Sequence, residues 1–212
     1  TLASLKALFV SAVYNGTNIY FLKKLWSLEM YKYLITSKDF YSNDIEIFCK
    51  TLSNQIEKYR PTHILYRDKD NKNYAKQAEH FLRVCRRYDG LKIFLHQDVE
   101  LAKELSATGV HLTSIQFSEI AKAKELGLQV IASTHSKKEI LRAKDLGADA
   151  VTYSPIFLSP NKGEPKGVEN LKEILNACDI DIFALGGIVT EEHIRSLEEI
   201  GVYGFASIRY FY

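Results

Sequence analysis

Residues 127–153 read GLQVIASTHSKKEILRAKDLGADAVTY and contain one strand–helix–strand unit. The apolar stretch 129–132 has the length of a buried strand, and a helical pattern over 137–146 follows it directly. Ser136 is placed to cap that helix, and Glu139 completes a capping box three residues later. The quoted stretch ends in a second apolar strand. Two strands joined by one helix are expected to lie parallel, with a right-handed crossover.

The same alternation extends in both directions along the chain. The sequence predicts strands at 31–36, 62–66, 91–95, 109–112, 129–132, 148–153, 180–185 and 202–208. It predicts helices at 44–59, 74–88, 99–105, 118–126, 137–146, 168–178 and 191–200. Eight such strands favour an α/β fold of the (β/α)8 TIM-barrel type over an open doubly wound sheet. Because the printed sequence stops soon after the last strand, we expect a barrel that lacks a normal last helix.

Residues 1–29 precede this pattern and are interpreted separately from a barrel over 30–212. The apolar stretch 2–13 is similar to a signal peptide, but the residues after it do not form a clean cleavage pattern. Met30, the only methionine, stands directly before the first strand. We interpret 1–29 as an N-terminal helical extension that packs on the barrel flank left open by the missing helix. The alternative is that it covers the same flank of a partner chain in a homodimer.

Bulk composition excludes several classes of protein. The net charge of +2 gives no indication of nucleic acid or membrane binding. No stretch of about 18 apolar residues is present, so no transmembrane helix is expected. Three widely spaced cysteines without a CxxC motif argue against a disulfide framework and a structural zinc site, and they favour a cytoplasmic protein.

In a β/α barrel the ends of all strands meet at one mouth, where active sites are built. Gly186 and Gly187 follow the seventh predicted strand, and glycines at such a turn let backbone N–H groups approach an anion. Barrels commonly hold phosphate in the loops after strands 7 and 8. We therefore predict phosphate binding by Gly186, Gly187 and the neighbouring Ser207, the alternative being a tight turn that simply requires glycine.

Cationic side chains follow two other strands. Arg67 and Lys69 alternate at the end of the second strand, so they point to the same side and suit a phosphate or carboxylate. Ion pairing with Asp70 is the alternative for this pair. Lys162 lies in a long loop with two prolines after the sixth strand, where a lysine can close on an anionic ligand or simply be solvated.

His135 stands between the fifth strand and a helix N-terminus. The positive end of a helix favours a neutral imidazole, which can accept a proton and pass it on. The alternative is a histidine that satisfies loop backbone. His111 lies inside the fourth strand and is interpreted as filling the barrel interior or forming a hydrogen bond there. His96 ends the third strand and could face the mouth.

Taken in order, these pieces resemble the thiamine phosphate synthase and TenI family over about residues 30–208. The resemblance rests on Tyr33-Leu34-Ile35-Thr36, Arg67-Asp68-Lys69, Gly109-Val110-His111-Leu112, Ser133-Thr134-His135-Ser136, Ser154-Pro155-Ile156-Phe157 with Lys162, and Gly186-Gly187-Ile188. It implies a TIM barrel that acts in thiamine biosynthesis and holds a thiazole phosphate at the glycine pair.

Two activities are implied by this resemblance. Synthases of the family are magnesium-dependent transferases, which join a pyrimidine diphosphate to the thiazole phosphate and release pyrophosphate. The TenI branch needs no metal and aromatises a thiazole carboxylate phosphate by moving a proton. The acid–base residue of that branch corresponds to His135.

The chain departs from the synthase pattern at the magnesium ligands. Gln97 and Gln116 stand where synthases carry acidic ligands, and Tyr66 stands where they carry glutamine. Amides bind a hard cation more weakly than carboxylates, although Asp98 would restore one ligand if the register shifts by one residue.

We therefore predict a TenI-like thiazole tautomerase with a small-molecule phosphate substrate, His135 as its catalytic residue and no metal ligands or cofactor. Arg67, Lys69 or Lys162 is expected to face the substrate carboxylate. The first alternative is a thiamine phosphate synthase, which would use magnesium. The second is a non-catalytic family member that binds a ligand or a partner protein.

Overall fold

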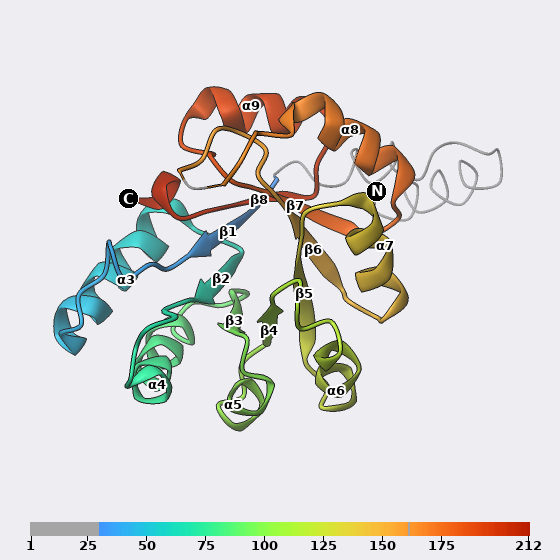
Figure 1. The fold of residues 1–212 in the computed structure, drawn as a ribbon. Coiled ribbons are helices and arrows are strands. Elements are labelled where there is room, and N and C mark those ends of the chain that lie inside the picture. Colours follow the sequence, from blue (N-terminus) through green and yellow to red (C-terminus); the bar gives the residue numbers. More distant parts are fainter. Residues whose placement is uncertain (1–29, 161) are drawn as a thin grey trace, which may run out of the picture. The chain divides into compact units, whose positions relative to one another are not determined.

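The computed structural model describes residues 30–160 and 162–212, which form a closed barrel of parallel strands (Figure 1). The strands are β1 (Tyr31–Ile35), β2 (His63–Tyr66), β3 (Lys92–His96), β4 (Gly109–Leu112), β5 (Gln129–Thr134), β6 (Ala150–Tyr153), β7 (Asp181–Leu185) and β8 (Gly204–Ser207). Each strand pairs with the next along the chain, and β8 pairs with β1 to close the ring. The predicted eight-stranded barrel is confirmed.

Helices surround the ring of strands (Figure 1). They are α3 (Ile45–Tyr59), α4 (Tyr74–Cys85), α5 (Val99–Glu104), α6 (Glu119–Glu125), α7 (Lys137–Asp145), α8 (Gly167–Ala177) and α9 (Glu191–Glu199). After β8 the described chain contains a single 3₁₀ turn, Arg209–Phe211. Within the described residues, no α-helix follows β8.

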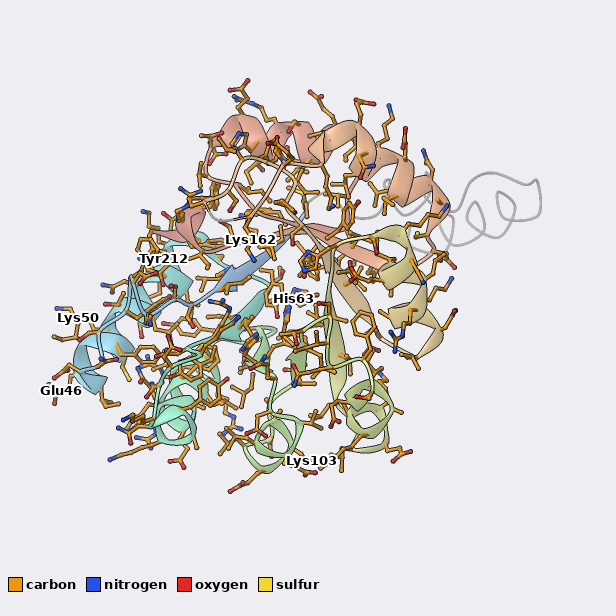
Figure 2. The ribbon with its side chains drawn as sticks, in the orientation of Figure 1. Glu46, Lys50, His63, Lys103, Lys162 and Tyr212 are labelled. Carbon is orange, nitrogen blue, oxygen red and sulfur yellow. The ribbon has the colours of Figure 1, made fainter. Side chains whose placement is uncertain are left out.

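Alternate residues of each strand fill the inside of the ring. The central cluster of buried side chains comprises Tyr33, Ile35, Leu65, Phe94, Ile131, Ala150, Phe183 and Ala206. Gly109 makes room for one of these rings, because a Cβ there would lie 2.8 Å from the Phe94 ring and 2.1 Å from the Gln129 carbonyl oxygen. His63 also lies within the ring of strands, whereas Glu46 and Lys103 lie on the outer helices (Figure 2). The interior is thus a packed core below the mouth and not a pore.

Several predicted boundaries differ from the structure by one to three residues, and the end of β5 is one that lies at the mouth. β5 continues to Thr134, two residues beyond the predicted end of that strand. Helix α4 ends at Cys85, before the predicted end at residue 88. The Ser136 hydroxyl caps α7 by accepting from the Glu139 N–H, as predicted. The Glu139 carboxylate accepts from the N–H of His135, one residue before the position that a capping box uses.

The predicted N-terminal helical extension over 1–29 lies outside the described residues. Among the described helices, none has both the length and the apolar character needed to span a bilayer. The cysteines are free thiols, on α3 (Cys49), on α4 (Cys85) and directly after α8 (Cys178). This agrees with the prediction that they form no disulfide framework.

Candidate active site

A cavity of about 520 Å³ opens at the carboxyl ends of the strands. It lies where the strand ends converge, which is the usual position of active sites in barrels of this type. Its lining includes every residue that the sequence placed in the site: Arg67, Lys69, His135, Lys162, Gly186, Gly187 and Ser207. The structure therefore brings these seven residues together, although they come from five different strand ends.

His135 lies at the junction of β5 and α7, with an exposed side chain. Its ring Nδ1 lies 3.2 Å from the backbone carbonyl oxygen of Ser154 and 3.2 Å from the Ser154 hydroxyl. A carbonyl oxygen only accepts hydrogen bonds, so this contact favours the tautomer with the proton on Nδ1. Nε2 forms no hydrogen bond to a described residue. In that tautomer Nε2 carries a free lone pair and can accept a proton.

The turn after β7 is built from Gly186 and Gly187, at φ angles of +98° and +72°. These angles lie in the left-handed region, which favours glycine. Both glycines also contact the loop after β6 closely. A Cβ on Gly186 would lie 2.8 Å from Pro155 Cα, and one on Gly187 would lie 2.5 Å from the Leu158 carbonyl oxygen. The turn thus requires glycine at both positions for conformation and for space.

Substituting alanine for Gly187 tests the space that this turn requires. A positive φ alone is expected to cost about 1–2 kcal/mol for a residue with a Cβ. The contact with the Leu158 carbonyl adds to that cost, because both groups belong to backbone. We expect Gly187→Ala to lower the free energy of unfolding by more than about 1–2 kcal/mol. We also expect it to weaken the binding of inorganic phosphate by about 10-fold or more.

Gly127→Ala is the matched control, because Gly127 has φ +77° and no atom within 4 Å of the added Cβ. It should show the conformational cost alone and leave phosphate affinity unchanged. Urea unfolding and titration calorimetry with phosphate measure the two effects. Equal stability losses in the two variants, with unchanged phosphate affinity, would contradict this account of the turn.

Ser207 lies at the end of β8 beside the glycine turn. Its hydroxyl donates to the Ile188 carbonyl oxygen at 2.8 Å and accepts from the N–H of Tyr210 at 3.2 Å. The hydroxyl hydrogen is therefore already in use within the protein. In this arrangement Ser207 links β8 to the glycine turn, and phosphate binding by Ser207 itself remains a prediction.

The three predicted cations form no ion pair with a described residue, although Asp39 also lines the cavity. Among the described residues, no Asp or Glu oxygen lies within 4.0 Å of the charged nitrogens of Arg67, Lys69 or Lys162. The positive charge of Arg67, then partial burial and the charge of Lys162, lower the pKa of Lys69. Like charges gathered this closely are relieved when an anion binds among them.

Arg67 and Lys69 do not form an ion pair with Asp70, which was the alternative role for them. Asp70 pairs with Lys38 at 2.5 Å. The backbone of Arg67 is held by Thr36, whose hydroxyl accepts from the Arg67 N–H at 2.8 Å. Burial lowers the pKa of the Arg67 guanidinium, which nevertheless stays charged.

The loop that carries Lys162 is joined to the glycine turn through backbone hydrogen bonds. The N–H of Ile156 donates to the Leu185 carbonyl at 3.0 Å, and the N–H of Phe157 donates to the Gly186 carbonyl at 2.9 Å. The glycine turn and the base of this loop therefore form one hydrogen-bonded unit.

Two buried histidines form part of the cavity floor. His96 and His111 are nearly inaccessible to solvent, and both line the cavity. Burial, then the charges of Arg67 and Lys69, lower the pKa of His96 to about 3. Burial, followed by His96 and Arg67, lowers the pKa of His111 to about 3. Both rings are therefore neutral at physiological pH.

The sequence did not single out Ser133, which also lines the cavity. Its hydroxyl lies 2.8 Å from Nε2 of His111, whose Nδ1 lies 3.0 Å from the hydroxyl of Tyr33. The sequence does contain a signal that Ser133 belongs to the site. Ser133 lies two residues before His135, so both side chains point to the inside of the barrel. The predicted strand stopped before both of them.

Gln97 and Gln116 occupy the positions that the family resemblance gives to magnesium ligands, and Asp98 follows Gln97 directly. The amide oxygen of Gln116 accepts from the N–H and hydroxyl of Thr113, at 3.2 and 3.0 Å, and its NH₂ group donates to the Gln97 carbonyl at 3.4 Å. Asp98 caps α5 by accepting from the Leu101 N–H at 2.9 Å. Within residues 30–160 and 162–212, no group of three His, Cys, Asp or Glu side chains is placed to hold a metal. The donor groups at these positions suit magnesium poorly, because amides bind it more weakly than carboxylates and both Gln116 amide groups are hydrogen-bonded within the protein.

Comparison with known proteins identifies relatives in one family. The family described as thiamine monophosphate synthase matches residues 32–211. The "Putative thiamine-phosphate synthase 2" of Aquifex aeolicus is 31% identical over 183 residues, which cover 84% of this chain and 96% of the relative. A thiamine-phosphate synthase of Lactococcus lactis subsp. lactis is 32% identical over 153 residues, covering 68% and 70%. The solved thiamine phosphate pyrophosphorylase from Pyrococcus furiosus superposes with a TM-score of 0.71 and 26% identity, over 84% of this chain and 85% of that one.

Proposed function

The chain belongs to the thiamine monophosphate synthase family, and from this premise we propose that it is a thiazole tautomerase of thiamine biosynthesis. The substrate would be a thiazole carboxylate phosphate, which the enzyme converts to its aromatic form by moving one proton. The observation that supports this proposal best is the position of His135, exposed at the mouth with Nε2 free and three unpaired cations lining the same cavity.

The substrate's two anionic groups suit two parts of the cavity. Phosphate suits the turn of Gly186 and Gly187, where the left-handed backbone leaves no side chain between the ligand and the main chain. The carboxylate suits Arg67 and Lys69, which the structure leaves without carboxylate partners among the described residues. Lys162 reaches the cavity from a loop joined to the glycine turn.

In this mechanism His135 carries the proton. The Ser154 carbonyl holds the proton of Nδ1, so Nε2 takes the proton from the ring carbon next to the carboxylate. The transient imidazolium then returns a proton to the carbon outside the ring, and the ring becomes aromatic. Arg67 and Lys69 stabilise the negative charge that develops between these two steps.

The donor groups at the synthase ligand positions favour tautomerase over synthase. Gln97 and Gln116 are amides, and the Gln116 oxygen is already bonded to Thr113. The Asp98 carboxylate caps a helix. A diphosphate leaving group needs charge stabilisation of the kind that a bound metal provides, and amides are weak ligands for such a metal. The names of the relatives support the synthase alternative, so the two activities must be separated by experiment.

Two assays on one preparation make that separation. We expect aromatisation of the thiazole carboxylate phosphate, followed by ultraviolet absorbance, at the same rate in EDTA as in magnesium. We expect no pyrophosphate release from the pyrimidine diphosphate and thiazole phosphate at any magnesium concentration. Magnesium-dependent pyrophosphate release would instead establish the synthase. Binding of thiazole phosphate with neither turnover would establish a non-catalytic ligand-binding protein.

A further inference from the structure

A chain of three polar groups runs from the centre of the barrel to the cavity. The Tyr33 hydroxyl lies 3.0 Å from His111 Nδ1, and His111 Nε2 lies 2.8 Å from the Ser133 hydroxyl. Tyr33 has no exposed surface, and His111 is 3% exposed. Ser133 and His111 both line the cavity, so the chain begins in the core and ends where a ligand binds.

Burial determines the direction of the hydrogen bonds in this chain. Tyr33 stays protonated, because burial raises the pKa of its phenol well above the usual value. Within the described part of the chain, His111 Nδ1 is the partner of the Tyr33 hydroxyl. If Tyr33 only accepted from Nδ1, its own hydrogen would be buried without an acceptor, which costs about 1–3 kcal/mol. Tyr33 therefore donates to Nδ1.

The neutral His111 ring passes this direction on to Ser133. A neutral imidazole has one N–H, so a ring that accepts at Nδ1 must donate from Nε2. The Ser133 oxygen then accepts from Nε2, and its own hydrogen remains available. Thr152, which faces Ser133 across the β5–β6 pair, has a buried hydroxyl without a partner in the described structure, so the serine hydrogen is not used there.

We propose that Tyr33 and His111 are positioning residues that hold the Ser133 hydroxyl as a hydrogen-bond donor to the ligand carboxylate. The identity of that carboxylate rests on the proposed function. His135 follows β5 directly and lies two residues after Ser133, so the two side chains point to the same side of the strand, roughly 7 Å apart. This separation lets the base act on the ring carbon while Ser133 binds the carboxylate attached to it.

The donor matters most while the proton is leaving the ring carbon. Negative charge then spreads into the adjacent carboxylate, where a fixed hydrogen-bond donor stabilises it. Ser133 also accepts from His111, and accepting one hydrogen bond strengthens the one that a hydroxyl donates. Because Ser133 would bind the carboxylate before and during the proton transfer, its loss is measured by kcat/KM.

A double-mutant cycle tests this coupling. We expect Ser133→Ala and Tyr33→Phe each to lower kcat/KM on the order of 10-fold. The double variant should be no slower than Ser133→Ala alone, because both changes remove the same donor. Independent effects that multiply to about 100-fold, or full activity in Tyr33→Phe, would overturn the proposal.

Tyr153→Phe is the matched control. Tyr153 is also buried, but its hydroxyl donates to Asn170 on α8, outside the ring of strands. It should lose about 1 kcal/mol of stability, comparable to Tyr33→Phe, with unchanged kcat/KM. A merely structural role for Tyr33 would make the two variants alike in activity as well as in stability.

Two measurements remain decisive if turnover is absent or a variant does not fold. In the unsubstituted protein, ¹⁵N NMR should show His111 protonated on Nε2, and protonation on Nδ1 would refute the proposed direction. By calorimetry, Ser133→Ala should weaken binding of the thiazole carboxylate phosphate about 10-fold and leave thiazole phosphate without the carboxylate unaffected. Equal weakening of both ligands would refute the role of Ser133, whether or not the protein is a tautomerase.

Discussion

Replacing His135 with alanine is expected to slow aromatisation of the thiazole carboxylate phosphate by about 10²–10⁴-fold, the usual contribution of a positioned acid–base group. The loss should appear in kcat, because the imidazole moves the proton and holds neither the phosphate nor the carboxylate. Phosphate binding should be unchanged, since the glycine turn lies on another strand end. Steady-state kinetics and phosphate calorimetry on one preparation measure both quantities.

The fold should tolerate this substitution. The His135 side chain is exposed, and its contacts with Ser154 lie at the mouth of the barrel. His80→Ala on helix α4 is the matched control, because His80 is a histidine that does not line the cavity. Near-normal turnover in His135→Ala would end the assignment of the catalytic base, and an equal loss in His80→Ala would point to a general effect on folding.

The barrel should lose stability steeply in mild acid. Burial, as the largest cause, lowers the pKa values of His63, His96 and His111 from about 6.5 to about 3. Between these two values the unfolded chain binds protons that the folded protein does not bind. The free energy of unfolding should therefore fall as the pH falls below 6.5, by about 1.4 kcal/mol per pH unit for each histidine and about 4 kcal/mol per unit for the three.

Urea unfolding at a series of pH values between 7 and 4 measures this slope. His63→Gln should reduce it by about one third, because His63 packs in the core against Phe94 and Phe183 without touching the cavity. A slope near 1 kcal/mol per pH unit in the unsubstituted protein would show that the three rings are not held neutral on folding.

Much of the fold could be predicted, because its signals are local. The Ser136 cap of α7 and the glycine that ends α6 at Gly127 mark element boundaries that hydrophobic periodicity alone leaves open. Parallel topology then places all strand ends at one mouth. For that reason the cavity collects the predicted site residues, including ones as distant along the chain as Arg67 and Ser207.

The partners of individual side chains could not be predicted in the same way. The contact between Tyr33 and His111 spans 78 residues and depends on how the strands tilt around the ring. Ser207 was assigned to phosphate, but its hydroxyl donates to the Ile188 carbonyl, an acceptor that the pattern of residues does not reveal. Asp98 caps helix α5, and its position directly before that helix is a local signal that the sequence contains. The register shift that would make Asp98 a metal ligand does not take this signal into account.

The neutral histidines of the floor also determine where the electric field of the cavity originates. With His96 and His111 uncharged, the positive charge of the lining resides on Arg67, Lys69, Lys162 and Arg209. An approaching anion is therefore attracted from a distance by the lysine and arginine groups, before it meets the uncharged groups beneath them. Capture of the ligand and its recognition are thus separated in space: charge selects it during the approach, and hydrogen bonding selects it on contact.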